Sequence, residues 1–147
     1  MKRIFKQKQH LLLLALIALI WTSCKVDKVL PVNESVKDIS GNWKVLKASR
    51  NGTDLTTLVD FTQFRVKFDA TGKYTLINPL PFVVNQDGNY KLDDPNYPFK
   101  IAFTPQGGQA VGIVFNYPIV GGARQLNLTF SPGCSLNSYT YTLVKEQ

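Results

Sequence analysis

From residue 41 onward, apolar and polar residues alternate over short runs that are separated by clusters of Gly, Pro, Asn and Asp. A period of two is typical of antiparallel strands with one buried face. The clearest run places Phe64, Val66 and Phe68 on one side of a strand and Arg65 and Lys67 on the other. The pattern predicts eight strands, at residues 43–48, 64–68, 73–76, 88–92, 99–103, 111–115, 125–130 and 139–144.

Eight antiparallel strands of this length can close into one barrel, which leaves no exposed sheet edge. We therefore predict an all-β domain over residues 41–147, a single antiparallel eight-stranded barrel, with a two-sheet β-sandwich as the alternative. Residues 69–72 predict a tight hairpin turn that ends in Gly. The one short helical candidate is the segment 54–60, where Leu55, Leu58 and Val59 follow Asp54 at helical spacing.

The first 24 residues have a different pattern, with a basic start at 1–10, an apolar run at 11–20, and then Thr22, Ser23 and Cys24. The apolar run is about half of the roughly 20 residues that a membrane-spanning helix needs, so it predicts export without a permanent span. The arrangement resembles bacterial lipoprotein signals. The resemblance implies a signal peptide at 1–23 and a lipid on Cys24. An uncleaved anchor or a plain secretory peptide is the alternative, which the lack of an A-x-A step disfavours.

Residues 25–38 mix charged and polar residues with scattered Val and Leu and show no periodicity. We interpret residues 24–40 as the lipidated Cys followed by a tether, whose reach is at most about 60 Å when it is extended. Lys25 follows Cys24 where inner-membrane retention in many such proteins uses Asp. The resemblance therefore implies the outer membrane of a Gram-negative bacterium, on its periplasmic or its external face.

The charge of the chain lies largely in the signal. Removing residues 1–23 takes away four of the 17 Lys and Arg residues, and the formal net charge falls from +7 to +3. So small an excess, without a basic cluster among aromatics, argues against a nucleic-acid partner. The single His of the sequence, His10, also leaves with the signal. Because His-dependent triads and zinc sites are then excluded, we expect a protein that is not an enzyme and that has no metal and no cofactor.

Two local features have a structural interpretation. Asp93 and Asp94 are sequence neighbours followed by Pro95, which predicts a turn and not a pair of catalytic carboxylates. Cys134 has no second thiol to pair with once Cys24 carries lipid. We expect Cys134 to be a buried structural thiol, with a reactive thiol as the alternative.

The first predicted strand opens with Gly41-Asn42-Trp43, and the last is Tyr139-Thr140-Tyr141-Thr142-Leu143. With eight predicted strands between them, these motifs resemble the lipocalin-like domains of bacterial lipoproteins over roughly residues 38–147. The resemblance implies a barrel whose base is plugged by Trp43, beneath a basic residue that follows the last strand, here Lys145. The Thr-Asp-x-x-Tyr pattern of typical lipocalins is missing from this sequence.

Aromatic residues fall mostly on one face of the predicted strands, where a barrel turns them inward. They form either a packed core or the lining of a cavity that binds a small hydrophobic or amphipathic ligand, with residues 55–61 as a lid. Tyr hydroxyls in the set favour a cavity slightly, although a Tyr at the rim is satisfied equally well. The candidate ligand-binding residues are Trp43, Phe64, Phe68, Tyr74, Tyr90, Phe103, Phe115, Tyr139 and Tyr141.

A second aromatic group lies in Pro-rich connections and comprises Phe82, Tyr97 and Tyr117. If these rings are exposed, they mark a contact surface. The alternative function is then a filled barrel that serves as an accessory module and holds a protein or glycan partner. Rings that fold back over the barrel ends are the structural alternative. The leading hypothesis remains a membrane-tethered, non-enzymatic lipocalin-like lipoprotein with a small ligand.

Overall fold

The computed structural model describes residues 34–146, and within that range the regular structure consists of antiparallel strands without a helix. The predicted signal peptide and Cys24, the predicted site of lipidation, lie outside the described residues. The ten strands are β1 (Gly41–Arg50), β2 (Thr53–Asp54), β3 (Arg65–Phe68), β4 (Lys73–Ile77), β5 (Gly88–Leu92), β6 (Lys100–Pro105), β7 (Val111–Asn116), β8 (Ile119–Val120), β9 (Ala123–Phe130) and β10 (Tyr139–Lys145).

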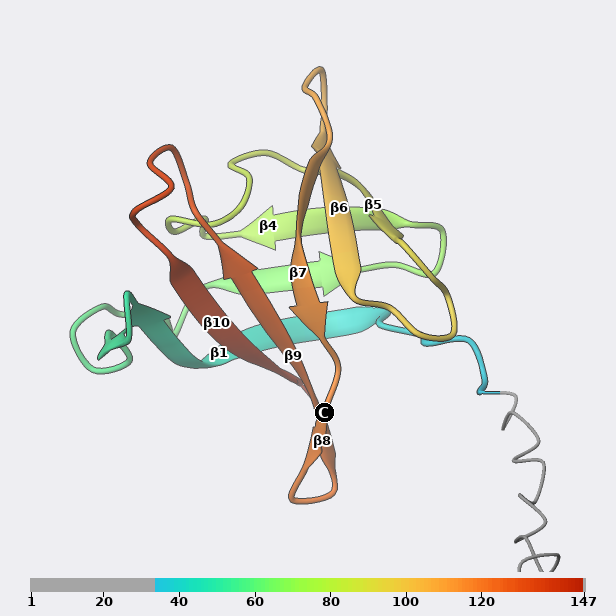
Figure 1. The fold of residues 1–147 in the computed structure, drawn as a ribbon, viewed down its shortest axis with the longest axis horizontal. Helices are drawn as coiled ribbons and strands as arrows, with labels where there is room; N and C mark the ends of the chain where they lie inside the picture. The colour runs from blue at the N-terminus through green and yellow to red at the C-terminus, as the bar shows by residue number, and fades with distance from the viewer. Residues whose placement is uncertain (1–33, 147) are drawn as a thin grey trace, which may run out of the picture. The chain divides into compact units, whose positions relative to one another are not determined.

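The sheet closes into a barrel because β1 pairs with both β3 and β10 (Figure 1). The ladder continues from β3 through β4, β5, β6, β7 and β9, and β9 returns to β10. The two-residue strands β2 and β8 are additions that pair with β1 and β9. The remaining strands form the predicted eight-stranded antiparallel barrel of the lipocalin-like type, and the β-sandwich alternative is wrong.

The hairpin between β3 and β4 is the tight turn that the sequence predicts. One carboxylate oxygen of Asp69 accepts hydrogen bonds from the backbone N–H groups of Thr71 and Lys73, each at 2.8 Å. Gly72 follows with φ of +84°, a conformation that other residues rarely adopt. The side chain and the glycine together fix the register of the two strands, with Phe68 opposite Tyr74.

The predicted helix at 54–60 does not form. The N–H groups of Leu58 and Val59 both donate to the carbonyl of Leu55, which makes one isolated turn. The start of the segment is held by β1 instead, because Leu55 N–H donates to the Ala48 carbonyl and the Thr56 hydroxyl lies against the same residue. The start of the segment is thus attached to β1, and the helical turn does not continue beyond Val59.

Residues 34–40, the described part of the predicted tether, pack against one end of the barrel. Lys37 N–H donates to the Pro95 carbonyl at 2.7 Å, and the Tyr117 hydroxyl donates to the Asp38 carbonyl at 2.7 Å. The indole N–H of Trp43 donates to the carbonyl of buried Ile39 at 2.8 Å. This short lead-in is therefore part of the folded domain, which begins before residue 41.

The opening Gly41-x-Trp43 motif has a local explanation. Trp43 is buried at the end of the barrel and lies opposite Lys145 in the ladder, while Gly41 has φ of +130°. A Cβ on Gly41 would come within 2.3 Å of the Lys145 Cε atom, so the glycine leaves room for the lysine side chain. Lys145 is the last residue of β10.

Candidate functional site

The interior of the barrel is aromatic. Seven of the nine predicted ligand-binding residues are almost completely inaccessible to solvent, and the other two, Tyr90 and Tyr139, are partly buried and pack against the core. The seven are Trp43, Phe64, Phe68, Tyr74, Phe103, Phe115 and Tyr141. Alternation along the strands directs all of them to the same face, as predicted.

The centre of this interior is filled by Phe82, a residue from the 78–87 connection between β4 and β5. Its ring centroid lies 5.5 Å from Phe64, 5.7 Å from Phe103, 5.5 Å from Phe130 and 6.2 Å from Tyr141. Phe82 is only 5% exposed, so its assignment to a surface interaction patch is wrong. The Pro-rich connection folds back into the barrel because burying the ring gains apolar contacts that solvent exposure would forgo.

The other two members of that patch lie at the opposite end of the barrel. Tyr97 is 49% exposed, in the β5–β6 connection. The half-buried Tyr117 ring stacks on Phe115, and the guanidinium carbon of Arg124 lies 4.3 Å from its centroid. The three predicted patch residues therefore do not form one surface.

The tyrosines of the interior differ in how their hydroxyls are satisfied. Tyr141 donates to the Pro81 carbonyl at 2.7 Å, and Tyr90 donates to the Asp69 carbonyl at 2.9 Å. The Tyr74 hydroxyl is buried and has no hydrogen-bond partner within residues 34–146. Burial, with a smaller effect of the Asp87 charge, raises the pKa of Tyr74 to about 12. Burial likewise raises the pKa of Tyr141 to about 12, so both phenols are neutral near pH 7.

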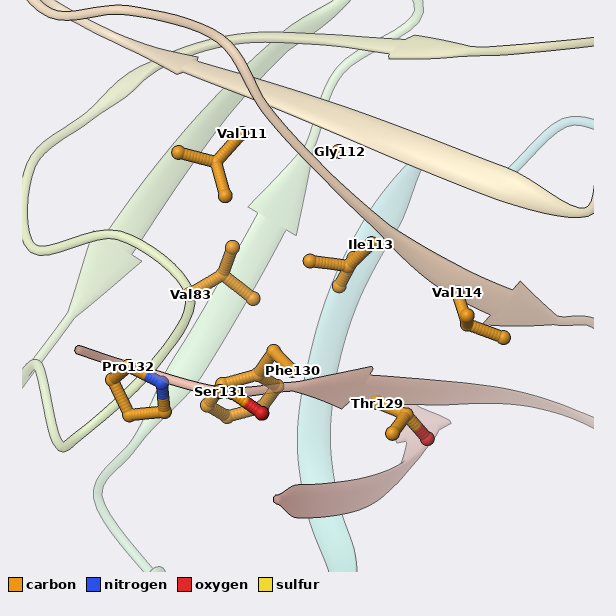
Figure 2. Close-up of a pocket in the computed structure, with 9 residues that line it drawn as sticks. All are labelled: Val83, Val111, Gly112, Ile113, Val114, Thr129, Phe130, Ser131 and Pro132. Atoms are coloured by element: carbon orange, nitrogen blue, oxygen red, sulfur yellow. The ribbon is translucent and has the colours of Figure 1, made fainter. Parts of the chain in front are cut away.

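A groove in the barrel wall is the candidate site that sequence reasoning missed. The ladder between β7 and β9 stops at the pair Val114 and Thr129, and the two strands diverge beyond it. Figure 2 shows Val83 between Val111 and Ile113 on one side and Phe130 on the other. The groove has a volume of about 340 Å³ and is lined by Val83, Val111, Gly112, Ile113, Val114, Thr129, Phe130, Ser131 and Pro132.

Backbone groups face this groove from β7. Phe115 N–H donates to the carbonyl of Phe99, which directly precedes β6, so alternation directs the N–H and C=O of Val114 and Gly112 away from β6 and toward β9. Val114 pairs with Thr129, but the ladder ends at this pair. Gly112 and Ser131, which would be opposite each other next in register, are therefore not paired. The splayed strands therefore present ladder hydrogen-bonding groups next to an apolar floor.

The floor of the groove connects to the aromatic core. Phe130 is buried, stacks on Tyr139 with centroids 5.7 Å apart, and meets Tyr141 edge-on at 5.1 Å. Ile113 is also buried. None of the nine lining residues has an ionisable side chain, so the chemistry that the groove offers is apolar contact with hydrogen bonds from backbone and hydroxyl groups. Such a surface suits binding.

The predictions for Cys134 and for the adjacent pair Asp93 and Asp94 have different outcomes. Cys134 is exposed in the loop between β9 and β10, so the expected buried thiol is wrong. That loop holds Pro132 and Gly133 at the barrel end, away from the strands that bury side chains. Asp93 and Asp94 do form the predicted turn. Asp93 accepts from the N–H groups of Phe99 and Lys100, each at 2.9 Å.

In residues 34–146, His, Cys, Asp and Glu do not gather in any group of three or more that could hold a metal ion. The same residues contain no helix with the length and apolar character needed to cross a membrane.

Comparison with known proteins gives one match. The family model described as "Domain of unknown function (DUF5004)" matches residues 22–144, which is most of the chain and contains nearly all of the barrel. Neither the curated proteins nor the solved structures gave a match. The chain therefore belongs to the DUF5004 family.

Proposed function

We propose that this protein is an outer-membrane lipoprotein, tethered through lipid on Cys24, whose lipocalin-like barrel binds a small hydrophobic or amphipathic ligand without catalysing a reaction. The observation that carries the proposal is the split between β7 and β9. The ligand would lie in the groove in the barrel wall, which replaces the barrel interior as the proposed binding place because Phe82 occupies the centre of that interior.

The composition of the groove supports an amphipathic ligand. A volume of about 340 Å³ lies at the lower end of the range for small-molecule pockets, which are commonly apolar with a few polar groups that orient the ligand. Here Val83, Ile113 and Phe130 would contact an apolar chain. The Ser131 hydroxyl and the Gly112 backbone would hydrogen-bond a polar end. The absence of an ionisable lining residue supports a neutral ligand group at this position.

The tether in this proposal rests on the sequence of residues 1–24, with its basic start, apolar run and Cys24. The resemblance to lipoprotein signals, with Lys25 and not Asp after Cys24, supports the outer-membrane location. A domain held beside a bilayer has continuous access to lipid-derived molecules. An acyl chain with a small polar head is therefore the ligand class that we expect.

Photocrosslinking with a diazirine-labelled fatty acid tests the ligand proposal. Membranes that carry the full chain are incubated with the probe and irradiated, and mass spectrometry locates the modified peptides. We expect modification at residues 111–114 and 129–132. Ser131→Trp places an indole at the mouth of the groove and should abolish that modification.

Gln63→Trp is the matched control, because it adds the same side chain at an exposed position in the connection between β2 and β3, outside the groove. Modification should persist in this variant. If the groove peptides stay unmodified in the wild type, or if Ser131→Trp leaves their modification unchanged, the groove is not the binding site.

A further inference from the structure

The end of the barrel that carries β8 has an exposed hairpin with an uncharged tip. Ile119 pairs with Arg124 and Val120 with Ala123, and the tight turn at Gly121 and Gly122 has positive φ at both residues. This hairpin projects from the barrel (Figure 1). Ile119 is 61% exposed and Val120 is 52% exposed. Residues 117–123 include no charged side chain, which is unusual for a solvated hairpin tip.

Other exposed apolar side chains belong to the same end. Phe99, which directly precedes β6, is 68% exposed and its carbonyl accepts from Phe115 N–H at the end of β7. Val36 is also exposed, and its neighbour Lys37 is hydrogen-bonded to the β5–β6 connection. Three segments that are distant in sequence thus present apolar side chains at one end. We name this the β8 end, comprising Val36, Tyr97, Phe99, Ile119 and Val120.

We propose that the β8 end is a membrane-contact surface, which inserts its apolar side chains into the headgroup and acyl boundary of the bilayer that holds the Cys24 lipid. This inference rests on the lipid anchor of the proposed function. Apolar and aromatic side chains partition into that boundary layer, and a second membrane signal adds to the hold of a lipid chain. The occupant of this surface is therefore a lipid bilayer.

The short distance in sequence between Cys24 and the β8 end favours the bilayer over other partners. Glu34 lies at the β8 end, where its carbonyl accepts from the Asn96 side chain. The ten residues after Cys24 run to Glu34. Their reach is at most about 35 Å, and any less extended path brings this end of the barrel closer to the membrane. The anchor therefore delivers the β8 end to lipid in preference to the opposite end.

The charges at this end are compatible with a lipid surface. Arg124 lies over the Tyr117 ring beside the hairpin, and Lys100 is exposed next to Phe99. Both cations can meet phosphate headgroups. The nearby Asp93 and Asp94 accept hydrogen bonds from backbone N–H groups of their own turn, and such bonds lower the pKa of Asp93. The lowered pKa keeps the Asp93 carboxylate ionised near pH 7, and the N–H groups of its own turn hold that charge.

The same orientation keeps the ligand groove accessible. Val111 and Ser131 lie toward the barrel end that is opposite β8, because β7 runs from Val111 to the β8 hairpin and β9 returns from it. Cys134 lies in the connection at that opposite end. Its exposed thiol is a natural reporter for the end of the barrel that faces away from lipid.

Depth-dependent fluorescence quenching tests the inference with the full, lipidated chain in vesicles of phosphatidylethanolamine and phosphatidylglycerol. An environment-sensitive fluorophore is attached at Val120→Cys in a Cys134→Ser background, and in a separate sample at native Cys134. We expect a blue-shifted emission at position 120 that spin-labelled lipids quench several-fold more strongly than emission at position 134. Phe99→Cys in the same background should behave like Val120→Cys.

The outcomes separate the two proposals. If the wild type carries lipid by mass spectrometry and floats with vesicles, but the labels at 120 and 99 are quenched no more than the label at 134, the membrane-contact surface is wrong and the anchor stands. If the N-terminal masses of wild type and Cys24→Ser differ only by the Cys-to-Ser exchange and neither protein floats, the anchor is wrong, and the inference that rests on it is overturned as well.

Discussion

Two buried tyrosine hydroxyls inside the barrel differ in hydrogen bonding. Tyr141 donates to the Pro81 carbonyl at 2.7 Å and so holds the β4–β5 connection against the core. Tyr74 is equally buried, but its hydroxyl has no partner within the described chain. A buried polar group without a hydrogen bond costs free energy, whereas a satisfied one contributes modestly to stability.

Removing each hydroxyl should therefore have different effects. We expect Tyr141→Phe to lower the free energy of unfolding by about 1 kcal/mol, because the Pro81 carbonyl loses its donor. Tyr74→Phe should leave that free energy unchanged or raise it by up to about 1 kcal/mol. Urea unfolding followed by tryptophan fluorescence measures both. Equal losses in the two variants would show that the Tyr74 hydroxyl has a partner in solution.

The same two residues predict a loss of stability in alkali. Burial raises the pKa of each phenol to about 12, whereas the unfolded chain ionises near the ordinary value of 10.0. Their contribution is complete below about pH 10 and is lost as the pH rises through about 12, because the unfolded state releases its protons first.

Urea midpoints measured from pH 8 upward should therefore fall above about pH 10. The double variant Tyr74→Phe, Tyr141→Phe should show a shallower decline than the wild type. Parallel declines in the two proteins would place the alkaline sensitivity in other groups.

At the level of elements, the period-two pattern predicted the eight barrel strands because each has one face in the core, as in Val66 and Phe68 of β3. The pattern could not show β2 and β8, which are two residues long and lie outside the core. The apolar spacing at 55–59 predicted a helix, but the segment forms only one isolated turn. Its first residue, Leu55, donates its N–H to the Ala48 carbonyl of β1.

The site was harder to predict than the strands. The inward-facing aromatics follow from strand alternation, but the position of Phe82 depends on how a connection folds over them. The groove arises where β7 and β9 stop pairing, which is a relation between segments that no local pattern encodes. Gly112 within β7 and Pro132 just after β9 are the available signals, since both residues weaken a ladder.

The contact between β5 and β6 predicts a sharp contrast between two glycines. A Cβ on Gly88 would lie 2.0 Å from the Thr104 carbonyl oxygen, which is backbone and cannot swing away. We expect Gly88→Ala to lower the free energy of unfolding by about 1–3 kcal/mol through overpacking. Gly112→Ala is the control, because open space surrounds that position and its φ is not positive.

Chemical denaturation of the two alanine variants beside the wild type measures the contrast. Gly112→Ala should change the free energy of unfolding by less than about 1 kcal/mol, with a gain expected from the stiffer unfolded chain. A Gly88→Ala variant as stable as the wild type would mean that β5 and β6 are more widely separated in solution.

At the scale of the whole molecule, the barrel has two unlike ends. One end holds the lead-in at 34–40, the β8 hairpin and the last residues of β10. The other holds the long connections, from one of which Phe82 enters the core. Because Phe82 lies inside the barrel, the proposed recognition surfaces lie on the wall and at the ends. This arrangement separates the proposed ligand groove from the proposed membrane contact.

The pairing of β1 with β10 also governs when the barrel can form during synthesis. Contacts between segments that are distant in the chain form slowly, because a large loop must close first. Before β10 is available, β1 and β9 have open edges that other chains can pair with. The barrel therefore cannot close until its final strand is available.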